Sequence, residues 1–113
     1  MRINYHNRKF AGVLNTPNGQ VNSDTVFHYK QQEQILTATY KGGRIQQGSI
    51  LGIVREDNSL AFVYHHIDTN GNLKSGHCIS RPEVLSEGRV RLHEFWEWTF
   101  GGSGKGESVV EEI

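Results

Sequence analysis

The stretch from Val90 to Phe100, VRLHEFWEWTF, alternates strictly between two sets of side chains. Its even-numbered positions are mostly large and apolar, and they include both tryptophans of the protein. This period of two predicts a β-strand with a buried aromatic face. Glu94 is the exception on that face, because a buried carboxylate is costly unless a hydrogen-bonding partner satisfies it.

The rest of the chain repeats the same pattern in shorter runs. Segments rich in glycine and asparagine, such as Gly42-Gly43 and Asn70-Gly71, separate runs with a period of two, and no helical period is sustained over ten residues. We therefore expect about eight antiparallel strands joined by short hairpins. The expected strands are residues 9–15, 25–30, 35–41, 44–54, 60–68, 73–81, 90–100 and 107–112.

A single sheet with one continuous apolar face must bury that face. Because no helix is predicted to cover it, the sheet is expected to close on itself, which also removes its exposed edges. The predicted fold class is all-β, a single antiparallel up-and-down barrel. Residues 1–113 are expected to form one domain, because this length supports one hydrophobic core and not two.

Composition narrows the possible partners. Twelve basic and twelve acidic residues give a formal net charge of zero, which argues against the basic surface that binds nucleic acid or an anionic membrane. No apolar run approaches the roughly 20 residues that span a bilayer, and the first residues lack the apolar core of a signal peptide. A cytoplasmic location is therefore expected. The single cysteine, Cys78, cannot form an internal disulfide and is expected to pack as a small apolar residue.

Pairing across the tight turns predicts which polar side chains share the inner face. With Asn70-Gly71 as a two-residue loop and residues 86–89 as a four-residue loop, Arg81 lies opposite Glu94 and would neutralise it. The lining would suit one small apolar or planar molecule. The predicted ligand-binding residues are Tyr40, Gln47, Tyr64, His66, His77, Arg81, Glu94, Trp96 and Trp98.

Three functions are compatible with this inner face. The first is non-enzymatic binding of a small molecule. The second is a structural or interaction barrel with a filled core, in which Trp96 and Trp98 only pack. The third is an enzyme with His66 or His77 as general base beside Glu94. No cofactor is expected, and a homodimer through an outer sheet face is one further expected partner.

Two other features of the sequence bear on possible binding sites. His65 and His66 point to opposite faces of a strand, and His66 with His77 lacks a third ligand, so no metal site is predicted. The segment GGSGKGES differs from a phosphate-binding loop, because Gly106 follows Lys105 where a serine or threonine is required. It also lies between strands and so lacks a helix N-terminus that would hold an anion.

The stretches LTATYKGGRIQQGSILGIV, YHHIDTNGNLKSGHC and VRLHEFWEWTFGGSGKGESVVEEI resemble a family of small uncharacterised bacterial proteins that are often labelled N-acetylglutamate synthase. The resemblance spans essentially the whole chain and implies a calycin-like barrel, similar to lipocalins, fatty-acid-binding proteins and avidins. An acetyltransferase would need a glycine-rich loop that opens a helix, which this pattern lacks, so we expect a binding barrel and not that enzyme. Gly12, Asn15 and the LTATY stretch are avidin-like. Leu14 stands where avidins have a tryptophan, so no avidin ligand residue is transferred.

Overall fold

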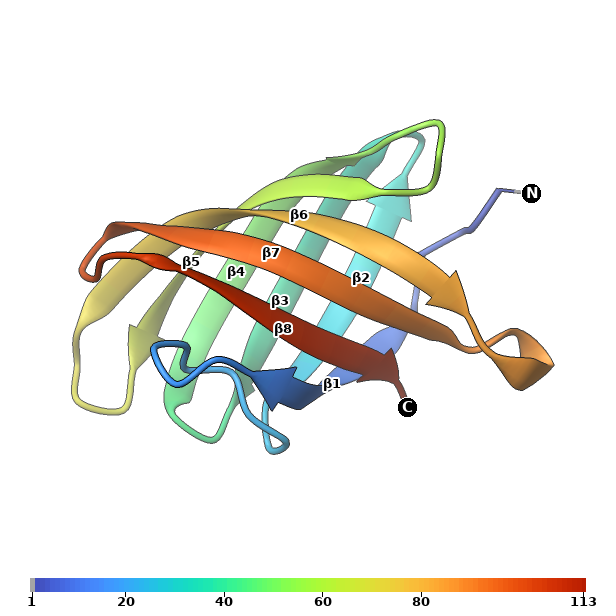
Figure 1. Cartoon of the computed structure of the whole chain (residues 1–113). Coiled ribbons are helices and arrows are strands. Elements are labelled where there is room, and N and C mark those ends of the chain that lie inside the picture. The colour runs from blue at the N-terminus through green and yellow to red at the C-terminus, as the bar shows by residue number, and fades with distance from the viewer. Residues whose placement is uncertain (1) are drawn as a thin grey trace.

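The computed structural model describes residues 2–113, most of which form one antiparallel sheet closed into a barrel (Figure 1). Each strand pairs with the next along the chain, and pairing of the first strand with the last closes the ring. The predicted all-β, up-and-down barrel is confirmed. The strands are β1 (Lys9–Asn15), β2 (Val26–Gln32), β3 (Ile35–Gly42), β4 (Ile45–Val54), β5 (Leu60–Asp68), β6 (Leu73–Val84), β7 (Val90–Phe100) and β8 (Lys105–Glu112).

The strand bounds follow the predicted ones closely. β1, β5 and β7 begin and end where the alternation predicts, and β6 continues through Pro82 to Val84. The one helical element among the described residues is the 3₁₀ turn η1 (Ser86–Gly88). It is far shorter than a helix that crosses a bilayer.

Three hairpins have loops of three residues, where the sequence predicted two or four. Backbone hydrogen bonds enclose residues 56–58 between β4 and β5, residues 69–71 between β5 and β6, and residues 86–88 between β6 and β7. Each of these loops ends in a residue with positive φ, which is the usual geometry of a three-residue hairpin loop. These residues are Asn58 (φ 70°), Gly71 (φ 82°) and Gly88 (φ 77°).

A change of one residue in a loop turns the following strand over, because successive side chains point to opposite faces. β6 follows one of these loops, whereas β4 is turned over by a register shift in its pairing with β3 between Tyr40 and Gly42. Over residues 47–54 of β4 and 76–81 of β6 the even-numbered residues face inward, and the odd-numbered ones that we predicted to be inside face outward. Ile50 and Val54 are buried, whereas Leu51 and Ile53 are 58% and 57% exposed.

Three predicted site residues lie on the outer surface for this reason. Gln47, His77 and Arg81 are all exposed, so their predicted inward placement is wrong. The predicted pairing of Arg81 with Glu94 is also wrong. Ser80 is opposite Glu94 across the β6–β7 ladder, and Arg81 is opposite His93 on the outside.

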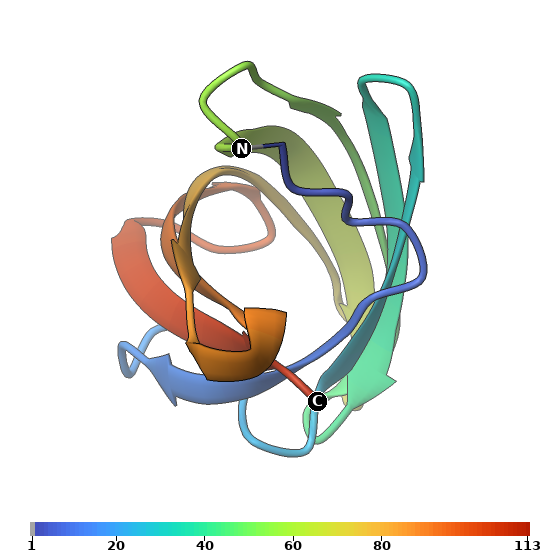
Figure 2. The same ribbon diagram turned by 90° about the vertical axis from the view of Figure 1, so that its right-hand side faces the viewer.

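One end of the barrel interior is filled with side chains. The segment before β1 runs around this end, which faces the viewer in Figure 2. The Tyr5 hydroxyl donates a 2.6 Å hydrogen bond to the carbonyl oxygen of Asn58, and the Phe10 and Tyr29 rings pack 4.8 Å apart. The side chains that fill this half are completely buried, and they include Tyr5, Phe10, Tyr29, Leu36, Leu60, Leu92 and Val110.

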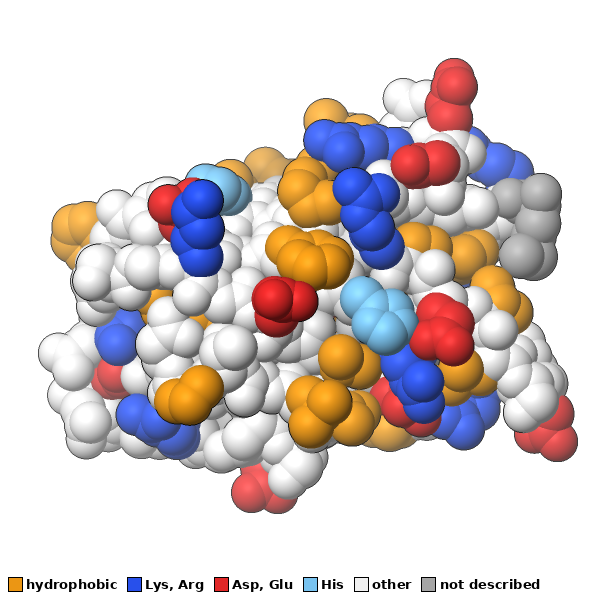
Figure 3. All heavy atoms as spheres, viewed as in Figure 1, with side chains coloured by type: hydrophobic (Ala, Val, Ile, Leu, Met, Phe, Trp, Pro, Cys, Tyr) orange, Lys and Arg blue, Asp and Glu red, His pale blue; other side chains and the backbone are white. Residues whose placement is uncertain are grey.

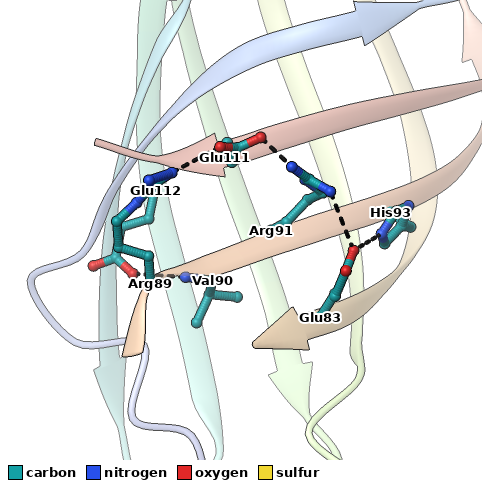
Figure 4. Close-up of polar contacts among 7 residues, drawn as sticks. All are labelled: Glu83, Arg89, Val90, Arg91, His93, Glu111 and Glu112. Atoms are coloured by element: carbon teal, nitrogen blue, oxygen red, sulfur yellow. Dashed lines mark hydrogen bonds and ion pairs between the residues drawn. The ribbon is translucent and has the colours of Figure 1, made fainter. Parts of the chain in front are cut away.

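A network of ion pairs joins β6, β7 and β8 on the outside of the same end (Figure 4). Glu111 accepts hydrogen bonds from Arg89 at 2.7 Å and from Arg91 at 3.0 Å. Glu83 contacts Arg91 at 3.5 Å and His93 at 2.8 Å. Solvent screens ion pairs of this kind and they add little to stability, so their main effect is to favour this register of the three strands.

The two tyrosines of the filled end predict opposite effects of removing a hydroxyl. Tyr29 Oη is buried and has no hydrogen-bond partner among residues 2–113, whereas Tyr5 Oη donates to a carbonyl group. Tyr29→Phe should therefore raise the free energy of unfolding by about 1 kcal/mol, because it removes an unsatisfied polar group. Tyr5→Phe is the matched control and should lower it by about 1 kcal/mol. Urea denaturation measures both changes, and a similar loss in the two variants would contradict this account.

Candidate functional site

The other half of the interior contains a cavity of about 50 Å³. This is several times the roughly 10–15 Å³ that one water molecule requires. The lining is rich in aromatic rings, which come from β2, β3, β5 and β7. These rings are Phe27, Tyr40, Phe62, Tyr64, Trp96 and Trp98.

Glycines on neighbouring strands make room for three of these rings. Each ring is paired directly with a glycine across the ladder, and a Cβ atom at that glycine would overlap the ring. Glycine inside a strand often marks such a close approach. The pairs are Tyr40 with Gly48, Tyr64 with Gly76, and Trp96 with Gly106. The rings therefore lie back against the barrel wall and leave the centre of this half open.

A chain of buried hydrogen bonds runs along one side of the cavity. Gln20 Nε2 donates to Asp68 Oδ2 at 3.0 Å, which orients the amide so that Gln20 Oε1 accepts from His66 Nε2 at 2.7 Å. His66 Nδ1 is then the acceptor for the Tyr40 hydroxyl at 2.8 Å. All four side chains are buried, and each forms a hydrogen bond with the next one in the chain.

Burial and hydrogen bonding fix the protonation states of the two ionisable groups in this chain of hydrogen bonds, His66 and Asp68. Burial lowers the pKa of His66 to about 4, so the imidazole is neutral at pH 7. Hydrogen bonds from Gln20 and from the backbone N–H groups of Asn72 and Asn70 lower the pKa of Asp68 to about 2. Both ring nitrogens of His66 are already engaged by protein partners, so neither is free to act as a general base on a substrate.

Glu94 is the charged group of the lining. It follows the fully buried Leu92 and precedes Trp96 on the inner face of β7, so it lies where the filled half meets the cavity. The Ser108 hydroxyl donates to Glu94 Oε1 at 3.1 Å. Burial raises the pKa of Glu94 to about 7, an effect that the hydroxyls of Ser108 and Ser80 partly oppose.

The segment between β1 and β2 lies over the mouth of the cavity. The Trp98 indole N–H donates to the carbonyl oxygen of Asn18 at 3.1 Å, and Asn18 Nδ2 donates to the carbonyl oxygen of Lys105 at 3.0 Å. Gln20 in this segment is 6% exposed. The mouth is thus covered by a strap that carries one of the polar groups of the site.

The cavity brings together six of the nine predicted site residues. These are Tyr40, Tyr64, His66, Glu94, Trp96 and Trp98. Gln47, His77 and Arg81 are outside it, and His77 instead contacts Glu97 on the surface at 3.5 Å.

Sequence reasoning missed several lining residues. Ile50 and Cys78 belong to the two strands that were turned over, and the spacing of Gly48 and Gly52 was the signal for the inner face of β4. Gln20 lies in a connection without a strand register, so no pattern in the sequence could have located it.

Potential metal ligands do not cluster in the part of the chain that the structure describes. No three His, Cys, Asp or Glu side chains within residues 2–113 come together as a metal site requires.

Comparison with known protein families identifies the family of this chain. The sequence model of the family described as "Avidin-like protein" matches residues 3–113. The chain belongs to the avidin-like family. This membership fits the closed barrel and confirms the expected calycin-like fold. No curated protein and no solved structure matches this avidin-like chain.

Glu94 and His66 predict opposite pH dependences of stability. The folded pKa of Glu94, about 7, lies above its ordinary value of 4.5, so its contribution to stability falls by about 3 kcal/mol as the pH rises from 4.5 through 7. The folded pKa of His66, about 4, lies below its ordinary value of 6.5, so its contribution is lost as the pH falls from 6.5 through 4. The titratable neighbours of Glu94 are Tyr29, Tyr40, Tyr64 and Cys78, whose raised pKa values keep them neutral in this range.

Because the two windows overlap, the wild-type free energy of unfolding should change little between about pH 4.5 and 6.5. Glu94→Gln removes only the first contribution. Its stability should therefore fall on acidification from pH 7 to 4, and at pH 8 it should exceed that of the wild type. His66→Gln is the control and should show the reverse slope. Denaturation curves across this pH range measure the effect, and parallel profiles for wild type and Glu94→Gln would refute it.

Proposed function

We propose that this chain binds a small molecule, without catalysis, in the cavity bounded by Glu94 and Trp98. The observation that carries the proposal is a barrel filled at one end and held open at the other. The glycine–aromatic pairs keep three rings against the wall, and the bond between Tyr40 and His66 fixes another edge of the space. Aromatic walls with a few convergent polar groups are typical of small-molecule sites.

The buried polar groups favour this function over a core that only packs. Burying Glu94 and the chain of hydrogen bonds through His66 costs more free energy than burying apolar side chains of the same volume. A structural barrel has no need of that cost, whereas a binding site uses such groups to orient its ligand.

An enzymatic function receives less support from the geometry. His77 is on the outer surface, and His66 has both ring nitrogens engaged by Tyr40 and Gln20. The strands that form the barrel offer no helix N-terminus for the pyrophosphate of an acyl-CoA, as an N-acetylglutamate synthase would require. The bacterial source and the cytoplasmic location stay predictions from the sequence.

A pair of variants at Cys78 tests the binding function. This residue is small and lines the cavity, so Cys78→Leu should fill the space without adding charge. Ligand-observed NMR with phenol, imidazole and 1-propanol as probes should detect saturable binding to the wild type. Cys78→Leu should weaken that binding by at least about tenfold, which corresponds to about 1.4 kcal/mol.

Cys78→Ala is the matched control, because it enlarges the cavity and should preserve binding. Melting curves establish that both variants are folded. Equal binding by the wild type and Cys78→Leu, or no binding of any probe to the wild type, would contradict the proposal.

We also propose that a second copy of the chain covers an outer face of the barrel. A row of apolar side chains crosses five neighbouring strands on the outside, each member paired with the next across the ladder. The row consists of Ile35, Ile53, Ala61, Ile79 and Phe95. Part of it lies on the face shown in Figure 3, where hydrophobic side chains gather over β6 and β7. An uncharged row is complementary to itself when a two-fold axis lays one copy on another.

The substitution Ile53→Lys tests this homodimer. A lysine in the middle of the row would be buried without a counter-charge in the dimer, so the variant should be monomeric while the wild type is dimeric. Light scattering after size-exclusion chromatography measures the mass. Leu73→Lys replaces an equally exposed apolar residue outside the row and should leave the dimer intact. A monomeric wild type would overturn the proposal.

A further inference from the structure

We infer that the cavity selects a small organic cation, an amine or ammonium group, over a neutral or anionic molecule of the same shape. Glu94 would be its counter-ion, and Trp96 and Trp98 would flank it. The inference rests on the proposed binding function and adds the chemical class of the ligand.

Most hydrogen-bond donors of the lining are already committed to protein acceptors, and the Trp96 indole N–H is an exception. The Trp98 indole N–H donates to Asn18, the Tyr64 hydroxyl to the carbonyl oxygen of Glu97, and the Ser108 hydroxyl to Glu94. The chain through Tyr40, His66 and Gln20 ends on Asp68. A ligand that presents mainly acceptors, as a carboxylate does, would have to break one of these bonds to engage any of these donors.

Acceptors, in contrast, are in surplus in the same lining. Glu94 Oε1 accepts one hydrogen bond from Ser108, and a carboxylate can accept several. Asn15 Nδ2 donates to the carbonyl oxygen of Val21, which orients the amide, and Asn15 Oδ1 is buried without a partner among the described residues. A group that brings donors satisfies both residues, and an ammonium group brings three.

The aromatic walls suit a cation as well. The Trp96 and Trp98 rings lie 5.4 Å apart at 64°, and the Tyr64 ring lies 5.8 Å from that of Trp98 at 68°. All three rings line the cavity, and a cation that lies over the face of one of them is attracted to it. The Trp98 ring already shows this chemistry, because Lys74 Nζ lies 5.3 Å from its centroid.

The alternative that must be tested is an anionic ligand paired with Lys74. This lysine lies outside the lining, over the ring of Trp98, and an anionic ligand would need such a cation as its counter-charge. Within the lining that the structure describes, no lysine or arginine balances Glu94. An anion in the cavity would therefore face an uncompensated carboxylate, whereas a cation would neutralise it.

Propylamine, 1-propanol and propionate form the test, because they share size and shape and differ in charge. Binding is measured by ligand-observed NMR at pH 8, where most Glu94 is ionised. The wild type should bind propylamine at least about tenfold more tightly than 1-propanol and should bind propionate most weakly. Glu94→Gln should remove the preference for the amine, and Lys74→Gln should leave it unchanged.

The outcomes separate this inference from the proposed function. Binding of all three probes with equal affinity, or a preference for propionate that Lys74→Gln abolishes, would overturn the cation inference while binding itself stands. Failure of all three probes to bind would instead overturn the proposed function. The wild-type ranking decides the inference even if Glu94→Gln does not fold.

Discussion

Closure of the sheet by the pairing of β1 with β8 is the constraint on which the rest of this structure depends. It gives eight strands a single shared interior, so the volume of each inward side chain must be balanced by the others. At one end, Tyr29 and its apolar neighbours use that volume completely. At the other end, glycines opposite Tyr40, Tyr64 and Trp96 let large rings lie against the wall, and the remaining volume becomes the cavity.

The two buried ionisable groups of the cavity are held in different ways. His66 is neutral and has a partner at each ring nitrogen, so its hydrogen-bonding capacity is satisfied within the protein. Glu94 has serine hydroxyls as its polar neighbours and no cation among the lining residues, and its pKa is raised accordingly. These different surroundings give the two residues different roles in the site. His66 fixes the wall, whereas Glu94 retains unused capacity to interact with a ligand.

The alternation of Val90–Phe100 and the turn residues were enough to predict the fold class and the bounds of most strands. The same reasoning placed Trp96, Trp98, Glu94 and His66 in one interior, because β5 and β7 have the predicted faces. It misplaced the residues of β4 and β6. The orientation of β6 depends on whether the loop before it has two or three residues, and several turn types suit sequences such as Asp68-Thr69-Asn70-Gly71. The orientation of β4 depends on a register shift in its pairing with β3, which the turn residues do not reveal.

The sequence by itself therefore determined a closed antiparallel barrel with an aromatic interior, since period and turn chemistry are local properties that the chain carries along its length. Only the tertiary structure decided which side chains line the cavity. Ring closure and loop geometry set the register. The residue opposite Glu94 on β6 is Ser80 and not the predicted Arg81, which is a difference of a single residue. Gln20 joined His66 and Asp68 because the segment between β1 and β2 folds over the mouth, a contact between distant residues that no local pattern encodes.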